Sequence, residues 1–144
     1  MKIAAIAAVC TITACAMLGG APSANAALLL FQSPSGNIAC QLYWFEPNTA
    51  SAGCEIRDHT FQTPPRPSHC EGAWGDSVGL LQGGPAKLDC HSDTLFGGNA
   101  ATLPYGATET LGPITCSSEP AGMTCRDSSS GHFFSLSRDS YRLG

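Results

Sequence analysis

Cysteines are the side chains of this sequence best suited to carry chemistry. The chain has eight cysteines, of which Cys10 and Cys15 lie within the first 26 residues. A cysteine nucleophile needs a free thiol of low pKa, and zinc needs closely spaced ligands such as Cys-x-x-Cys, which the sequence lacks. An even number of cysteines in a small exported domain is typical of disulfides. We therefore predict three bridges, no metal and no other cofactor; the cysteines are Cys40, Cys54, Cys70, Cys90, Cys116 and Cys125.

Two histidines flank a pair of these cysteines. His69 precedes Cys70, and His91 follows Cys90. A bridge between these cysteines would bring the imidazoles near one another, and two imidazoles can hold a metal ion. We prefer the interpretation that both are surface histidines.

A serine hydrolase would need a nucleophile, a histidine and an acid. His132 follows Asp127 and a run of serines, but a Gly-x-Ser-x-Gly elbow is absent. Carboxylates offer no clearer pair, because Glu55 and Asp58 beside Arg57 are expected to form a solvated strand face. We predict no catalytic residue and therefore no enzyme.

The alternation of apolar residues predicts the strands that position these groups. The pattern apolar-x-Cys recurs, so each cysteine should point to the buried side of a strand. Turn-forming Gly, Pro and Asn residues separate the segments. We predict an all-β, single-domain antiparallel sandwich or barrel-like fold, with a short helix as the alternative for 132–143. The predicted strands are 28–31, 37–45, 53–61, 77–82, 86–91, 113–118, 123–127, 132–137 and 140–143.

Hairpin symmetry predicts the disulfide pairing. The first two cysteines lie symmetrically about Pro47, and the last two about the Pro120–Ala121 bond. Paired strands bring opposite Cβ atoms close enough to accept a disulfide. The predicted pairs are Cys40–Cys54, Cys116–Cys125 and, by elimination, Cys70–Cys90.

The N-terminal 26 residues resemble a signal peptide. Lys2 precedes an apolar run from Ile3 to Leu18, and Ala24-Asn25-Ala26 forms a small-x-small cleavage site. Residues 27–144 would then be a secreted β domain. An alternative is a lipoprotein anchored through Cys15, since Ile12-Thr13-Ala14-Cys15 fits a loose lipobox. No later apolar stretch has the ~20 residues of a membrane span.

Length and charge exclude several classes of protein. The chain has 144 residues, enough for one domain, and carries 7 basic against 11 acidic residues, for a net charge of −4. A basic cluster is absent, so we predict no nucleic-acid partner. We take the protein as a monomer by default.

Consecutive aromatics mark the best candidate for a binding surface. Tyr43, Trp44 and Phe45 precede a turn at Glu46-Pro47-Asn48. Trp44 should share the buried cysteine face, leaving Tyr43 and Phe45 together on the other face. We predict that Tyr43 and Phe45 contact an unknown protein or glycan partner, with Glu46 and Asn48 as a polar rim. The alternative is a strand covered on both faces.

Several sequence blocks together resemble a known family. They are Phe31–Cys40, Cys54–Ile56, Leu103–Gly106, Gly112–Cys116, Gly122–Cys125 and Gly131–Arg138. In order and spacing they are similar to a family of small secreted actinobacterial domains, common in mycobacteria, whose function is unknown. Phe133 departs from the glycine expected near that position. The resemblance implies secretion and a disulfide-bonded β domain, and it implies no reaction.

Three functions remain open on these grounds. The first is a secreted, non-enzymatic binding or cell-envelope interaction module. The second is a hydrolase inhibitor that inserts a rigid loop such as 64–68 or 97–103. The third is a small hydrolase with His132 as its base.

Overall fold

The computed structural model describes residues 27–45 and 47–144. The predicted signal peptide, the alternative lipid site at Cys15 and the rim residue Glu46 lie outside these described residues. Within them the chain forms eleven strands and no helix, which confirms the predicted all-β class. These two ranges accordingly hold no helix of the length and apolarity needed to cross a membrane.

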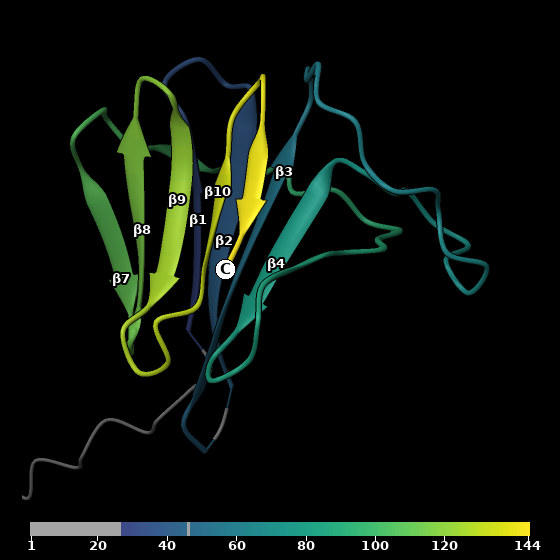
Figure 1. Cartoon of the computed structure of the whole chain (residues 1–144). Helices are drawn as coiled ribbons and strands as arrows, with labels where there is room; N and C mark the ends of the chain where they lie inside the picture. Colours follow the sequence, from purple (N-terminus) through teal and green to yellow (C-terminus); the bar gives the residue numbers. More distant parts are fainter. Residues whose placement is uncertain (1–26, 46) are drawn as a thin grey trace, which may run out of the picture.

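Two sheets pack face to face as a sandwich (Figure 1). All neighbouring strands are antiparallel except β1 and β6. Contacts of β2 with β7, of β3 with β8 and of β4 with β10 join the two layers. The first sheet has the order β5 (Lys87–Leu88), β4 (Ser77–Leu81), β3 (Thr49–Ile56), β2 (Ile38–Phe45), β1 (Leu28–Gln32), β6 (Ala101–Thr102). The second has the order β11 (Tyr141–Leu143), β10 (Phe133–Leu136), β9 (Gly122–Asp127), β8 (Ile114–Glu119), β7 (Thr108–Leu111).

The period-two pattern of each strand builds the core between the sheets. Even-numbered residues of β2 point inward, and the odd-numbered ones point to the outer face of the first sheet. Strands β8, β9 and β10 supply the facing apolar layer. The largest fully buried side chains include Phe31, Phe134, Leu42, Ile56, Ile114, Met123 and Leu136.

The structure confirms all three predicted disulfides. Cys40 pairs with Cys54 directly across β2 and β3, and Cys116 pairs with Cys125 across β8 and β9. These two bridges lie within the core, one in each sheet. The remaining bridge, Cys70–Cys90, lies outside the strands and joins two loops.

The prediction of strand limits is wrong for β3, for the strand predicted over 86–91, which is only β5 (Lys87–Leu88), and for two strands that were not predicted. The strand predicted over 53–61 ends at Ile56, because the Asn37 side chain donates to the Asp58 carbonyl (3.0 Å) and accepts from the Asp58 N–H (2.9 Å). Strands β6 and β7 were not predicted, since their short polar sequences lack apolar alternation. The segment 132–143 forms the β10–β11 hairpin, so the alternative of a helix there is also wrong.

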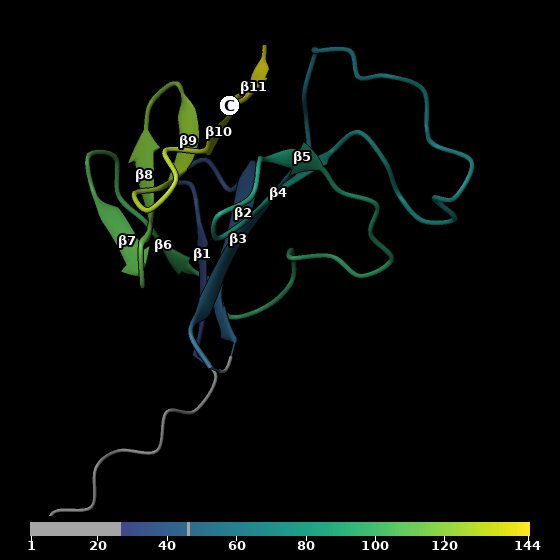
Figure 2. The same cartoon turned by 60° about the horizontal axis from the view of Figure 1, so that its bottom comes forward.

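Two long loops leave the first sheet and project from the sandwich (Figures 1 and 2). They span 57–76 and 89–100 and contain no strand. The Cys70–Cys90 bridge and an antiparallel bridge between Ala73 and His91 fasten them to each other. The Trp74 indole donates to the Pro64 carbonyl at 2.9 Å and closes the first loop upon itself.

Candidate functional site

An apolar row crosses the outer face of the first sheet. The strand register places Leu28 opposite Tyr43, Tyr43 opposite Ser51, and Ser51 opposite Leu81. Leu28 is 50 % exposed and Leu81 is 52 % exposed. Phe45 is 43 % exposed and packs edge to face on Tyr43, with ring centroids 4.4 Å apart. We call Leu28, Tyr43, Phe45 and Leu81 the outer apolar row.

The aromatic triplet of β2 divides between two faces, as its alternation predicts. Trp44 is partly buried, packs against the core and contacts Gly112 of the opposite sheet. Gly112 has φ +57°, and a Cβ there would collide with the indole. Tyr43 and Phe45 lie on the outer face. The Trp44 ring therefore anchors the strand on which the two candidate contact residues stand.

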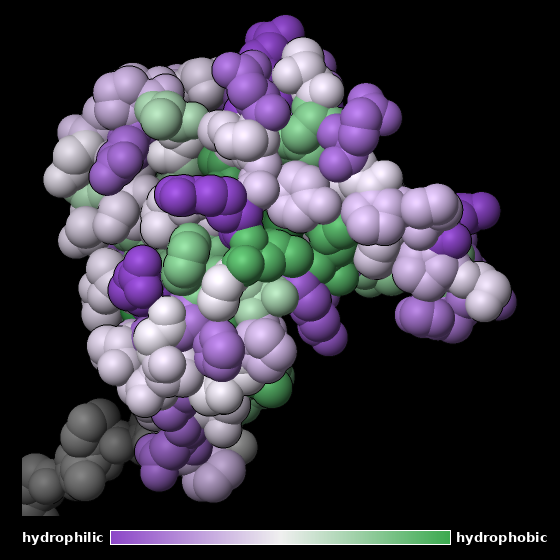
Figure 3. Space-filling model, in the orientation of Figure 1, coloured by the Kyte–Doolittle hydropathy of each residue, from purple (hydrophilic) through white to green (hydrophobic). Residues whose placement is uncertain are grey.

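A second exposed apolar area lies where the two sheets meet, and its origin differs from that of the outer apolar row. In Figure 3, apolar side chains gather near the middle of the view, between β10 and β4. Leu143 of β11 is 39 % exposed, but its register partner is Phe134, so it belongs to the inward-facing set. This apolar area is the edge of the core, seen where the two layers meet.

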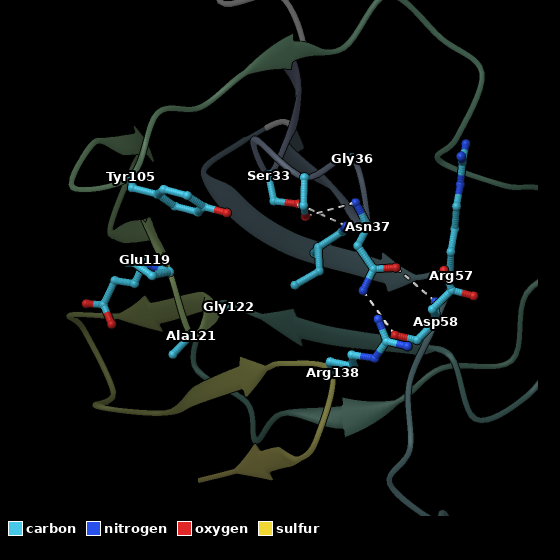
Figure 4. Close-up of a pocket in the computed structure, with 13 residues that line it drawn as sticks. Ser33, Gly36, Asn37, Arg57, Asp58, Tyr105, Glu119, Ala121, Gly122 and Arg138 are labelled. Atoms are coloured by element: carbon cyan, nitrogen blue, oxygen red, sulfur yellow. Dashed lines mark hydrogen bonds between the residues drawn. The ribbon is translucent and has the colours of Figure 1, made fainter.

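A polar pocket of about 410 Å³ opens at one end of the sandwich, where turns of both sheets meet. Figure 4 shows Tyr105 on one side and Asn37 and Arg138 on the other. The lining carries two arginines, Arg57 and Arg138, and two acids, Asp58 and Glu119. These charges are equal in number, so the pocket has no net charge.

A second polar cluster lies under the 89–100 loop. His91 Nδ1 is 2.8 Å from Glu55 Oε1, and His91 Nε2 is 2.9 Å from Asp76 Oδ1. The other Glu55 oxygen accepts hydrogen bonds from the Thr94 hydroxyl (2.8 Å) and the Leu95 N–H (2.7 Å). Burial lowers the His91 pKa, but hydrogen bonds to Asp76 and to the Asp93 carbonyl, with the nearby acidic charges, outweigh it and raise the pKa above 6.5.

Two interpretations made from the sequence are wrong here. Glu55 was expected on a solvated face, yet it is only 3 % exposed because the 91–96 segment covers it. His91 was expected to be a surface histidine, yet it is half-buried between two carboxylates. Local sequence carries no signal for either, since Leu95 lies 40 residues from Glu55 and Asp76 lies 15 residues from His91. In residues 27–45 and 47–144, no group of His, Cys, Asp and Glu side chains is placed to hold a metal.

Asp89 borders this cluster, beside a cavity of about 400 Å³. Its carboxylate lies over Gly79, where a Cβ would collide with it. Burial raises the Asp89 pKa, while the charges of Lys87 and His91 act in the opposite direction.

Asp127 and His132, the acid and the base of the hydrolase hypothesis, contact a turn and the C-terminal residue, respectively. Asp127 is 0 % exposed and accepts four hydrogen bonds, from Gly83 N–H (2.7 Å), Ser129 N–H (2.8 Å), Ser129 Oγ (2.6 Å) and Ser130 Oγ (2.8 Å). Burial alone would raise its pKa, but these donors outweigh burial and lower it to about 2. His132 Nδ1 lies 3.1 Å from the Gly144 carbonyl. The two side chains thus have separate partners.

Fold and surface together define a small two-sheet β sandwich held by three disulfides. The chain belongs to a family of unknown function (DUF6636), whose model matches residues 11–143. No curated protein and no solved structure matches it. Membership agrees with the resemblance to a family of unknown function; the secreted and actinobacterial character of the family stays a prediction.

Proposed function

We propose that this protein is a secreted, non-enzymatic binding module that contacts a partner protein through the outer apolar row. The observation that carries the proposal is the register of four strands, which gathers Leu28, Tyr43 and Leu81 in one line with Phe45 beside it. Strands β1, β2 and β4 thus contribute apolar side chains to one face of the sheet, and Ser51 of β3 lies between Tyr43 and Leu81.

The composition of the row favours a protein over a sugar as the partner. Two of its members are leucines, which offer no hydrogen bond, and the cross-strand neighbours Ser51 and Thr49 are uncharged. Exposed contiguous apolar area is rare on monomeric domains, and burying it gains roughly 25 cal/mol per Å². Aromatic anchors such as Tyr43 and Phe45 dominate the binding energy of many protein interfaces.

Secretion is supported by the covalent frame and by the leader sequence. Three disulfides are typical of an oxidising compartment. Residues 1–26 have the order of charged, apolar and small residues that a signal peptide needs. A lipid anchor at Cys15 would instead hold the same domain at a membrane, and mass spectrometry of the exported protein distinguishes the two.

Site-specific crosslinking tests the proposed surface. A benzoylphenylalanine placed at Phe45 should give one discrete adduct in culture filtrate and envelope extract, and the same group at Thr110, an exposed residue of β7 in the second sheet, should not. Excess wild-type chain should abolish the adduct, whereas excess Tyr43→Ser/Leu81→Ser should compete at least tenfold less well. The variant should melt within a few degrees of wild type, because both side chains lie on the outer face.

Three results would contradict the proposal. The first is the absence of any adduct at Phe45, and the second is equal competition by the variant and the wild type. The third is an adduct of twice the chain mass, which would show that the row joins two copies of this chain.

The projecting loop supports hydrolase inhibition as a second candidate. Residues 57–76 stand away from the sandwich, and the Cys70–Cys90 bridge and the Trp74–Pro64 hydrogen bond restrain them (Figure 2). A restrained loop loses little entropy when it enters an active site. A panel of proteases and glycosidases should contain one enzyme inhibited by wild type and at least tenfold less by Arg66→Ala; no inhibition at all would remove this candidate.

A further inference from the structure

The polar pocket lies at the opposite end of the β1–β2 hairpin from the outer apolar row. The Ser33–Asn37 turn, the Glu119–Gly122 turn and the side chains of Tyr105 and Arg138 enclose it. Its volume of about 410 Å³ falls within the range of roughly 300–1,000 Å³ that is usual for small-molecule sites. Because both sheets contribute to it, the sandwich fold itself creates the pocket.

The walls of the pocket are fixed before any ligand arrives. The Asn37 amide is paired with both backbone groups of Asp58. Ser33 Oγ accepts from the Ile38 N–H at 3.1 Å and lies 3.0 Å from Ser35 Oγ. On the far wall, Gly122 has φ +152° and lies against the Leu136 carbonyl, so that a Cβ there would collide. A preorganised pocket avoids much of the ordering cost of binding.

The groups free to meet a ligand are an aromatic ring, hydroxyls and one guanidinium. Tyr105 is 47 % exposed, and Figure 4 shows its hydroxyl directed across the pocket toward Ser33. Arg138 is held by its backbone, since the Thr60 N–H donates to its carbonyl at 2.8 Å. Across the described ranges, its guanidinium makes no ion pair with a carboxylate. Arg57 is engaged elsewhere, 4.2 Å from the centre of the Phe96 ring.

We propose that this pocket binds one neutral sugar residue at the end of a glycan chain. A sugar ring has an apolar C–H face, which would pack on Tyr105, and hydroxyl edges, which would hydrogen-bond to Ser35 and Arg138. The balanced charges of the lining give an ionic ligand no net attraction, and the polar walls give an apolar ligand no dry surface. The pocket is open on one side, which leaves room for the rest of the chain.

Titration of the 27–144 domain with named sugars tests the proposal. Chitotriose, cellotriose and maltotriose are the neutral probes, and a trigalacturonate is the acidic one. Nuclear magnetic resonance should show saturable shifts of the Gly36, Tyr105 and Gly122 amides with at least one neutral probe, and none at Tyr43. Tyr105→Ala and Arg138→Ala should each weaken binding at least tenfold, whereas Tyr105→Phe, which keeps the ring, should weaken it less than threefold.

Arg66→Ala is the matched control, because Arg66 is an exposed arginine in the projecting loop. Its affinity should equal that of wild type, and the melting temperatures of all four variants should agree within a few degrees. Failure of every neutral probe to bind, binding of trigalacturonate alone, or unchanged affinity in Tyr105→Ala would each overturn the proposal. None of these results bears on crosslinking at Phe45, so the two proposals fail separately.

Discussion

Glu55 and Asp127 are two buried carboxylates that the fold stabilises in different ways. Glu55 lies on the outer face of the first sheet and faces a titratable cation, His91, together with two donors of the 91–96 segment. Asp127 lies at the end of β9 and accepts only from uncharged donors, three in its own turn and one from Gly83.

The difference shows what each acid holds in place. Glu55 fastens a loop to a sheet, and part of that attachment depends on a proton on His91. Asp127 connects the two sheets, because Gly83 belongs to the turn between β4 and β5. The Asp127 contact depends only on the ionisation of Asp127 itself. The two contacts should therefore respond oppositely to pH, and the following predictions test that contrast.

Removal of the Glu55 carboxylate should have the largest effect. Glu55→Ala leaves the Leu95 N–H and the Thr94 hydroxyl without their acceptor and removes one of the two carboxylates that pair with His91, and breaking a buried pair in this way costs about 3 kcal/mol. Urea unfolding at pH 6 measures the loss, and hydrogen exchange of residues 91–96 should accelerate. The exposed Glu119→Ala is the control and should stay within about 0.5 kcal/mol of wild type. If Glu55→Ala also loses no more than about 0.5 kcal/mol of unfolding free energy, the loop is held by other contacts.

Loss of the Asp127 charge should be the next largest effect. The folded pKa of about 2, against 3.8 for a free aspartate, corresponds to about 2 kcal/mol of stability. Because the folded pKa is lowered, this contribution is present above pH 4 and disappears as the pH falls toward 2. Asp127→Asn should remove it, giving lower stability at pH 7 and a flatter acid transition. Asp139→Asn, an exposed control, should keep the wild-type profile; an acid transition unchanged in Asp127→Asn would refute the assignment.

The His91 contact should weaken in the alkaline direction. Its folded pKa is raised, so its stabilisation is complete below pH 6.5 and disappears as the pH rises through the folded pKa. Unfolding free energies between pH 5 and pH 9 should fall in wild type and stay flat in His91→Gln. His69→Gln is the control and should follow wild type, since His69 is exposed. Equal slopes in all three proteins would mean that the His91 proton does not stabilise the fold.

Replacement of Asp89 should have the smallest effect on stability, and it should raise the free energy of unfolding rather than lower it. Burial raises its pKa, so its ionised form costs stability at neutral pH. Asp89→Asn should therefore stabilise the protein at pH 7, by less than about 1 kcal/mol because the group is partly open to solvent. The gain should vanish below pH 4, where both states are protonated. Thermal melts at the two pH values measure it, and a destabilised Asp89→Asn at pH 7 would contradict the argument.

Local pattern was sufficient for the two hairpin disulfides and for the faces of β2, whereas Cys70–Cys90, which joins two loops, followed only by elimination. Cys40 and Cys54 could be paired from the sequence because a hairpin turn sets the register of its own two strands. The same alternation placed Trp44 on the core and Tyr43 with Phe45 on the other side. The ends of the strands were harder to predict. Strand β3 ends where Asn37 binds Asp58, a contact between residues 21 positions apart.

The sequence alone determined the cysteine framework, the all-β class and the alternation that exposes Tyr43 and Phe45. Only the tertiary structure decided which parts of the first sheet stay exposed. Tyr43 and Glu55 both point to the outer face, yet Glu55 is covered by residues 91–96 while the outer apolar row is not. The tertiary structure also placed Leu28 and Leu81 on the same face as Tyr43 and Phe45, and it placed Tyr105 and Arg138 in the lining of one pocket. Alternation fixes only the face of a strand, whereas burial of that face depends on where distant loops fold.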